Sequence, residues 1–305
     1  MKFLSKIFTK RATSTLGPPA ARIQILSDLH LELGQQYSSY RFPALAPILL
    51  LAGDVGRIID FEGYLQFLEA QVCRFEVVLL VLGNHEFYGM DHFTGMEKAR
   101  FLTQQPSLKK KVILLDRTRW DDPNSQLSIL GCTLWSDIPD DSSSIVKSRI
   151  NDFKRINDWS VQKNNGLHRE DVAWLREQVH LISSQNTDDN GRRLLVATHH
   201  APCVDGTSRP EQVANPWTCA FATDLISGQE SWNGIRVWVF GHTHYTNDFV
   251  SNGIRLVSNQ RGYVLPGSSA HIDNKKAIKT AHDFTATKII KIWSRFGLVY
   301  TELLL

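Results

Sequence analysis

Short apolar runs, each followed by polar residues, recur along this chain of 305 residues. The runs at Pro47–Ala52 and Glu76–Leu82 are almost continuously apolar, which is typical of strands that are buried on both faces. Shorter runs of the same kind predict further strands at Arg22–Leu26, Lys111–Leu115, Leu127–Leu134, Arg193–Ala197, Arg236–Phe240 and Ile254–Val257.

Helical spacing of apolar residues separates several of these strands. It predicts helices at Phe61–Phe75 and Glu170–Ile182, and a third from about Asp91 to Gln104. The polar stretch Ser136–His168 lacks clear periodicity and is interpreted as a long surface excursion with some helix in it. The apolar stretch Ile289–Leu304 is expected to close the core. The alternation of strands and helices favours α/β layers in a single domain.

The first 21 residues differ from the rest and set a domain boundary. Residues 1–21 are expected to form a flexible basic segment, and residues 22–305 the folded domain. A helical face made of Phe3, Leu4, Ile7 and Phe8, with lysines elsewhere and no acidic residue, also fits a mitochondrial presequence. A solvated tail ending at Gly17-Pro18-Pro19 is the alternative.

Composition narrows the class of protein. Hydrophobic residues make up 42% and charged residues 21%, which is ordinary for a globular protein. The net charge of +3, without a basic stripe interleaved with aromatics, gives no strong signal for nucleic acid. No apolar run approaches the length of a membrane span. Four scattered cysteines favour free thiols in a reducing compartment, so we expect an intracellular, cytoplasmic protein, with mitochondrial import as the other option.

Asp, His and Asn residues collect where five of the predicted strands end. They stand in Asp28-Leu29-His30, Gly53-Asp54, Gly83-Asn84-His85-Glu86, Thr198-His199-His200 and Gly241-His242-Thr243-His244. Functional residues of α/β sheets gather beyond the carboxyl ends of strands, so these five ends can converge. Carboxylate, imidazole and amide ligands suit Mn, Fe or Zn.

The two histidine pairs raise separate questions. His242 and His244 point the same way if their strand continues, because the period of a strand is two. Neighbours on a strand face opposite sides, so only one residue of the pair His199 and His200 is expected to reach a metal.

The ordered motifs D-x-H, G-D, G-N-H-E, T-H-H and G-H-T-H resemble those of the calcineurin-like metallophosphoesterase superfamily. The resemblance runs from Arg22 to about Arg261. It implies an α/β fold in which a two-sheet β-sandwich is flanked by helices (αββα), around a dinuclear metal centre. Asp28, His30 and His244 match the ligands of one metal; Asn84, His242 and, of the histidine pair, His199 match those of the other. Asp54 matches the bridging carboxylate, and His85 the catalytic histidine near the leaving group.

The implied chemistry is hydrolysis of a phosphate mono- or diester. Two cations about 3.5–4 Å apart can clamp the attacking and leaving oxygens while a metal-bridging hydroxide attacks in line. His85 would donate a proton to the leaving group, a step worth typically about 10²–10⁴-fold.

Two departures separate the chain from protein serine/threonine phosphatases. Arg57 stands where those enzymes carry a second Asp, and Leu82 stands where they carry an arginine before G-N-H-E. The acidic partner of the catalytic histidine is therefore missing from its usual place. The chain resembles instead the phosphodiesterases and small-molecule phosphatases, with a phosphorylated small molecule or a phosphodiester as substrate. Residues 136–168 and Cys203–Cys219 are expected to wall the site.

Other interpretations remain open. Arg57 and Arg261 could reach a substrate phosphate, or could make structural ion pairs. A non-catalytic scaffold of the same fold that binds a protein partner is a second interpretation, although such a scaffold typically loses ligands that are all present here. A nuclease of the same superfamily is a third, although neither a basic groove nor a capping domain is visible.

Overall fold

Eleven strands form two sheets in the computed structural model, which describes residues 21–185, 191–228, 232–266 and 282–293. The first sheet has five strands in the order β11-β1-β2-β3-β4, and β11 alone is antiparallel to its neighbour. These strands are β1 (Ala21–Leu26), β2 (Ile48–Ala52), β3 (Val77–Val81), β4 (Val112–Leu114) and β11 (Ile289–Ile292).

The second sheet has six strands in the order β5-β6-β7-β8-β10-β9. Its four inner strands are parallel, and the two edge strands are antiparallel to their neighbours. These strands are β5 (Thr118–Asp121), β6 (Leu127–Cys132), β7 (Arg193–Thr198), β8 (Ile235–Phe240), β9 (Asp248–Ser251) and β10 (Ile254–Ser258).

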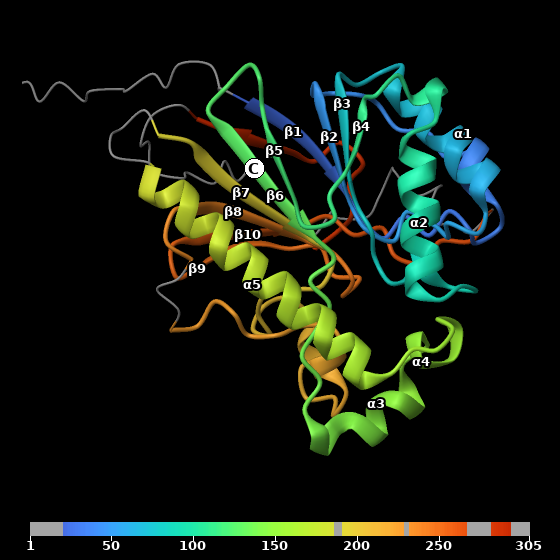
Figure 1. Ribbon diagram of the computed structural model, residues 1–305, viewed down its shortest axis with the longest axis vertical. Helices are drawn as coiled ribbons and strands as arrows, with labels where there is room; N and C mark the ends of the chain where they lie inside the picture. The colour runs from blue at the N-terminus through green and yellow to red at the C-terminus, as the bar shows by residue number, and fades with distance from the viewer. Residues whose placement is uncertain (1–20, 186–190, 229–231, 267–281, 294–305) are drawn as a thin grey trace, which may run out of the picture.

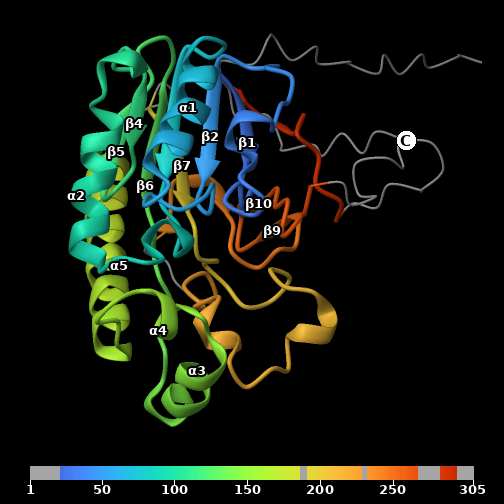
Figure 2. The ribbon, with the colours of Figure 1, turned by 90° about the vertical axis from the view of Figure 1, so that its right-hand side faces the viewer.

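Helices cover the outer faces of both sheets (Figure 1). Helices α1 (Phe61–Val72) and α2 (His92–Thr103) lie over the first sheet, and α5 (Val161–Gln185) lies along the second. The short helices α3 (Ser143–Arg149) and α4 (Asp152–Arg155) lie beyond the end towards which the parallel strands point (Figure 2). No helix in the described ranges is both long and apolar enough to cross a bilayer.

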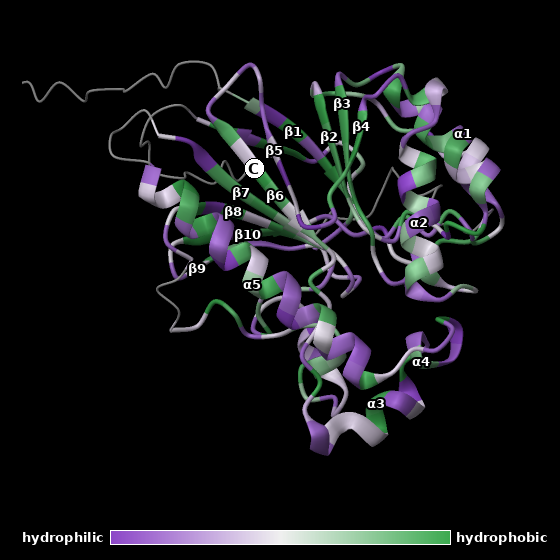
Figure 3. Ribbon diagram, in the orientation of Figure 1, coloured by the Kyte–Doolittle hydropathy of each residue, from purple (hydrophilic) through white to green (hydrophobic). Residues whose placement is uncertain are grey.

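Successive side chains of an inner strand point to opposite faces of its sheet, so each strand contributes to two core layers. In β2, Leu49 and Leu51 pack with Tyr64 and Phe67 of α1, whereas Leu50 joins the core between the two sheets. Both faces of such a strand are buried, which explains the continuous apolar runs in the sequence. Figure 3 shows the same division, with largely hydrophobic strands inside and helices of mixed hydropathy around them. The predicted two-sheet sandwich flanked by helices is confirmed.

Most predicted elements lie within a few residues of their predicted bounds, but α5 differs. It begins at Val161, nine residues before the predicted Glu170, so the end of the supposed surface excursion is helical. After Val161, the buried side chains of its first turns are polar: Asn164 donates to the carbonyl of Ser136, and His168 bonds the carbonyl of Leu134. A buried stripe held by hydrogen bonds leaves no hydrophobic periodicity to detect.

Other predictions fall at the edges of the fold or outside the described residues. The edge strands β5 and β9 have mixed polar sequences and were not predicted. Of the apolar stretch Ile289–Leu304, the part that the structure describes supplies β11, which pairs with β1. The predicted basic segment lies outside the described residues as far as residue 20, and residues 294–305 also lie outside them.

Candidate metal centre

The carboxyl ends of β1, β2 and β3 in one sheet meet those of β7 and β8 in the other, and the loops that follow bring the motif residues together. Backbone hydrogen bonds join these loops: His30 N–H donates to the carbonyl of Asp54, and Gly241 N–H donates to the carbonyl of His199. The residues positioned this way are Asp28, His30, Asp54, Asn84, His85, His199, His242 and His244.

Glu86 fixes the loop that carries Asp54. Its fully buried carboxylate accepts the backbone N–H groups of Asp54 and Val55 at 2.9 and 2.8 Å, and that of Gly83 at 2.7 Å. The hydroxyl of Tyr64 donates to the same carboxylate at 3.0 Å. The G-N-H-E motif therefore uses its last residue to hold two strand ends in register, and its middle residues for the site.

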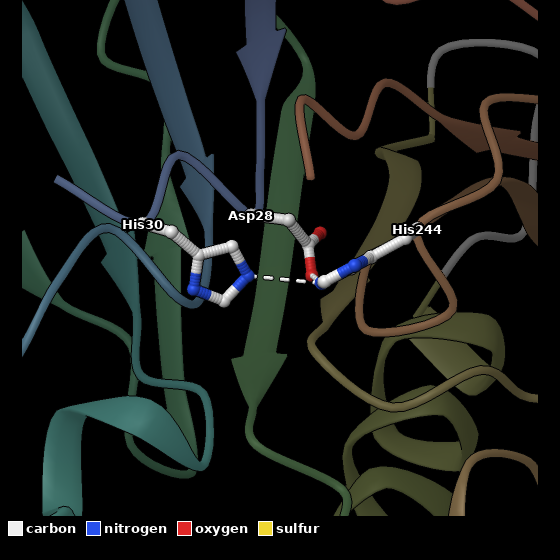
Figure 4. Close-up of side chains that lie close together, drawn as sticks. All are labelled: Asp28, His30 and His244. Carbon is white, nitrogen blue, oxygen red and sulfur yellow. Dashed lines mark hydrogen bonds and ion pairs between the residues drawn. The ribbon is translucent and has the colours of Figure 1, made fainter. Parts of the chain in front are cut away.

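Asp28, His30 and His244 form one group of donor atoms that lie within 4.8 Å of one another. Nε2 of His30 lies 2.9 Å from Nε2 of His244, and Asp28 Oδ1 lies 3.5 Å from the latter atom. Figure 4 shows Asp28 and His30, from the loop after β1, converging with His244, from the loop after β8. Two imidazole nitrogens and a carboxylate oxygen pointing at one small volume suit a divalent cation of the transition series.

Asp54, His199 and His242 form a second group, and all three are buried. Nε2 of His199 lies 3.4 Å from Asp54 Oδ1 and 3.1 Å from Asn84 Oδ1. The other carboxylate oxygen, Asp54 Oδ2, lies 3.7 Å from His30 Nε2 in the first group. One oxygen of Asp54 thus faces each group, which is the arrangement of a bridging ligand.

The chemistry of the donors fits two cations. Nε2 of His242 is buried and makes no hydrogen bond to any described residue, so its electron pair is available to bind a cation. Burial lowers the pKa of His199 and of His85, but Asp54 and the other carboxylates around these rings together outweigh it and raise the pKa values to about 10 and about 9. Burial instead lowers the pKa of His242 and of His244, so the negative charge of the centre acts most strongly on His199 and His85.

The backbone of this centre is unusual. Asp28, His30, Asp54, His242 and His244 all have positive φ, between 46° and 71°. Residues other than glycine rarely adopt this left-handed conformation, and such strain clusters at functional sites. The conformation also corrects one prediction. Strand β8 ends at Phe240, so His242 and His244 do not share a strand face, and each belongs to a different donor group.

His199 and His200 have different surroundings. His199 belongs to the second donor group, whereas the ring of His200 bonds Ser136 Oγ through Nδ1 at 2.7 Å. The His200 ring also stacks on His242, with centroids 4.0 Å apart. His200 therefore supports His242 from behind, and the structure brings His199 to Asp54 and Asn84.

Two carboxylates that the sequence did not single out touch these residues. Asp152 Oδ1 accepts from Asn84 Nδ2 at 2.7 Å and from the hydroxyl of Tyr88 at 2.7 Å. Glu32 Oε1 accepts from His85 Nδ1 at 2.8 Å. Asp152 lies in the polar stretch without a motif, so no signal identified it. Glu32 follows Asp28 and His30 at the same spacing of two, which was the available signal.

A cavity of about 300 Å³ opens beside the centre. Its walls include Arg149 and Asp152 from the stretch 136–168, and Gln212 and Trp217 from the stretch 203–219, so both predicted segments contribute. His85 and Tyr263 also line it, and the hydroxyl of Tyr263 is 3.2 Å from His85 Nε2.

The two arginines considered as phosphate ligands lie elsewhere. Arg57 forms an ion pair with Asp60 at 2.9 Å, and Arg261 donates to the carbonyl of Leu29 at 2.9 Å and to Gln36 Oε1 at 2.8 Å. Neither is among the residues that line the cavity, and the expected structural ion pair is found for Arg57, whereas Arg261 is held by these hydrogen bonds.

Comparisons with known proteins agree with the observed fold. The family model described as calcineurin-like phosphoesterase matches residues 21–246. An uncharacterized protein of Acanthamoeba polyphaga mimivirus is 28% identical over 267 residues, covering 79% of this chain and 91% of the viral protein. The crystal structure of phosphopantetheinyl hydrolase from Mycobacterium tuberculosis is similar with a TM-score of 0.58 and 17% identity, covering 83% of this chain and 93% of that one.

Proposed function

The chain belongs to the calcineurin-like phosphoesterase family, and we propose that it hydrolyses a phosphate mono- or diester with the help of two divalent metal ions. Membership makes it a hydrolase of phosphoester bonds. The two-metal centre, the ligand assignment and the substrate are the proposal. The observation that carries it is Asp54, whose two carboxylate oxygens face two separate groups of donor atoms.

We assign the ligands from these groups. Asp28, His30 and His244 would hold one cation, Asn84, His199 and His242 would hold the other, and Asp54 would bridge them. The set suits Mn, Fe or Zn. When bound, two such cations supply an acidified water as nucleophile and positive charge at the phosphate.

His85 would act on the leaving group. Its Nδ1 is engaged by Glu32, so its Nε2 is the atom turned towards Tyr263 and the cavity. A proton held on Nε2 can pass to the departing oxygen as the bond to phosphorus breaks. His85 is not a member of the two proposed ligand sets, although its ring packs against that of His30 with centroids 4.4 Å apart.

The cavity favours a small organic leaving group. Its volume of about 300 Å³ is at the lower end of the range for small-molecule pockets. Among the described residues that line it, Arg149 is the sole arginine or lysine, and its guanidinium lies 5.4 Å from the ring centroid of Trp217. A polyphosphate or a nucleic-acid strand would call for more positive charge than this.

Hydrolysis of two model esters tests the proposal. Purified protein with Mn²⁺ is assayed on p-nitrophenyl phosphate and bis(p-nitrophenyl) phosphate, beside chelated protein and the Asp54→Asn variant. We expect turnover that requires metal and is lost in the variant, and the preferred ester identifies a mono- or diesterase. Two bound metals without turnover on either ester would indicate a narrow natural substrate. Absence of both metal and turnover would contradict the proposal and favour the protein-binding scaffold.

A further inference from the structure

Arg57 does not replace the missing acidic partner of His85. It stands at the position where protein serine/threonine phosphatases carry an Asp, and its Nη2 lies 2.9 Å from Asp60 Oδ1, three residues further along the chain. That ion pair holds its side chain away from the cavity. If His85 has a carboxylate partner, it comes from another part of the chain.

Glu32 supplies a carboxylate at the required atom. Its Oε1 accepts the Nδ1–H of His85 at 2.8 Å, and the side chains are 7% and 11% exposed. The contact is largely shielded from water, where a hydrogen bond to a carboxylate is strong.

The backbone holds Glu32 in place. The flanking loop is anchored to the loop after β2 by Leu31 N–H, which donates to the carbonyl of Val55 at 2.9 Å. The next turn is closed by Leu33 N–H, which donates to the carbonyl of His30 at 3.1 Å. The position of Glu32 is thus tied to the same strand ends that carry Asp28 and Asp54.

One oxygen of Glu32 serves two histidines. Oε1 also lies 3.3 Å from Nδ1 of His30. A carboxylate oxygen has two lone pairs, so it can accept from both rings. Each ring then keeps its Nδ1 proton and turns Nε2 towards the centre, as a bare donor atom in His30 and as the working atom in His85.

We propose that Glu32 is the positioning residue of His85, acting from the loop after β1 in place of the acidic residue missing at position 57. This inference rests on the proposed function for its kinetic consequence, but the hydrogen bond itself can be tested without it. The competing interpretation makes Glu32 a metal ligand, because its carboxylate, His30 and His85 also lie within 4.8 Å of one another.

Kinetics of Glu32→Gln distinguish the two interpretations. The variant keeps the shape of the side chain and removes its charge. We expect kcat to fall by about 10–100-fold on phenyl phosphate, and less on p-nitrophenyl phosphate, whose leaving group needs a proton least. His85→Ala should show the same preference, and the double variant should be no slower than His85→Ala. Bound metal should stay at the wild-type level, and Asp60→Asn, the matched control, should keep the wild-type ratio of the two rates.

The hydrogen bond is observed directly by nuclear magnetic resonance. In full-length protein loaded with diamagnetic Zn²⁺ and labelled with ¹⁵N-histidine, the Nδ1 proton of His85 is identified as the signal lost in His85→Ala. We expect this signal in the wild type and in Asp60→Asn, and expect it to shift or vanish in Glu32→Gln. This measurement needs no turnover, so it tests the hydrogen bond between Glu32 and His85 even if the wild type hydrolyses neither ester.

Three results would overturn the inference. The first is a double variant whose loss of kcat is the product of the losses in the two single variants. The second is loss of metal from Glu32→Gln, and the third is a His85 signal that is unchanged in Glu32→Gln. The second would make Glu32 a ligand, and the third would show that its contact does not orient the ring. Failure of the proposed function is a separate result, namely a wild type that binds no metal and hydrolyses neither ester.

Discussion

His199 Nδ1 donates to the backbone carbonyl of Ala52 at 2.9 Å. The bond joins the two sheets, because Ala52 ends β2 and His199 follows β7. It also fixes the tautomer: with the proton on Nδ1, Nε2 is left as an electron-pair donor facing Asp54 and Asn84. His200 makes no such contact with Ala52, since its Nδ1 bonds Ser136.

The two neighbouring histidines should therefore respond differently to substitution. We expect His199→Ala to lose one of two bound metals and nearly all turnover, because it removes a donor atom. His200→Ala should keep most of its metal, because it removes only a ring stacked behind His242. Metal analysis after gel filtration checks this, and greater loss from the His200 variant would reverse the assignment.

Replacing His85 should separate catalysis from metal binding. His85→Ala should lower kcat by about 10²–10⁴-fold, the usual worth of a positioned proton donor. Its metal content should stay near that of the wild type, since the proposed ligand sets remain complete. A variant that loses metal would show that His85 is a ligand or holds the site together.

Asp152 should matter for metal affinity because it orients an amide. By accepting from Asn84 Nδ2, it turns Asn84 Oδ1 towards His199 and the second group. We expect Asp152→Ala to weaken one metal by about 10–100-fold, measured by titration against a competing chelator. Asp141→Ala, at an exposed carboxylate of the same segment, serves as the control. Equal affinities in the two variants would contradict the role of Asp152.

Gly83 should tolerate no side chain. A Cβ added there would collide with Asp54 Oδ1 and lie 2.7 Å from the His199 ring. Gly83→Ala should therefore lose metal and cost about 1–3 kcal/mol of unfolding free energy, as overpacking does. Gly166→Ala in α5, where a Cβ meets nothing within 4 Å, should instead leave activity intact and stabilise the protein slightly. Urea unfolding and metal analysis of both variants check the contrast.

Asp248 should stabilise the edge of the second sheet in a pH-dependent way. Burial raises its pKa, but the hydrogen bonds and charges of Arg255 and Lys288 together outweigh this and lower it. A carboxyl with a lowered folded-state pKa stabilises the fold above its unfolded pKa, and this stabilisation is lost as the pH falls through the folded-state value. Asp248→Asn should cost about 1 kcal/mol at pH 7, and less near pH 3. Urea unfolding with chelator present checks this, and a cost independent of pH would contradict it.

The layers of the fold were predictable because burial leaves a pattern in the sequence. Strands such as β2 and β3 are buried on both faces and are continuously apolar, so their existence and order were read correctly. The start of α5 was not, because Asn164, His168 and Asp171 are buried there by hydrogen bonding. Which polar side chains find such partners depends on loops that are distant in sequence.

Some residues of the candidate site could likewise be predicted from the sequence, and others could not. Asp28, Asp54 and the histidines follow strands and belong to motifs, so their meeting was predictable, although their roles remain proposals. Asp152 contacts the site through tertiary structure alone, which spacing in the sequence does not reveal, whereas the spacing of Glu32 from Asp28 and His30 was an available signal. The strand argument for His242 and His244 was wrong because the chain turns into a left-handed conformation after Phe240.

That left-handed backbone bears on how such a sequence would change by neutral drift. At each of the five positions of the centre with positive φ, glycine would relieve the conformation, and asparagine tolerates it better than histidine does. A lineage that kept the fold only to bind a partner would gain stability from such replacements, and nothing would select against them. The presence of aspartate and histidine at every one of these positions is therefore what selection for hydrolysis would maintain.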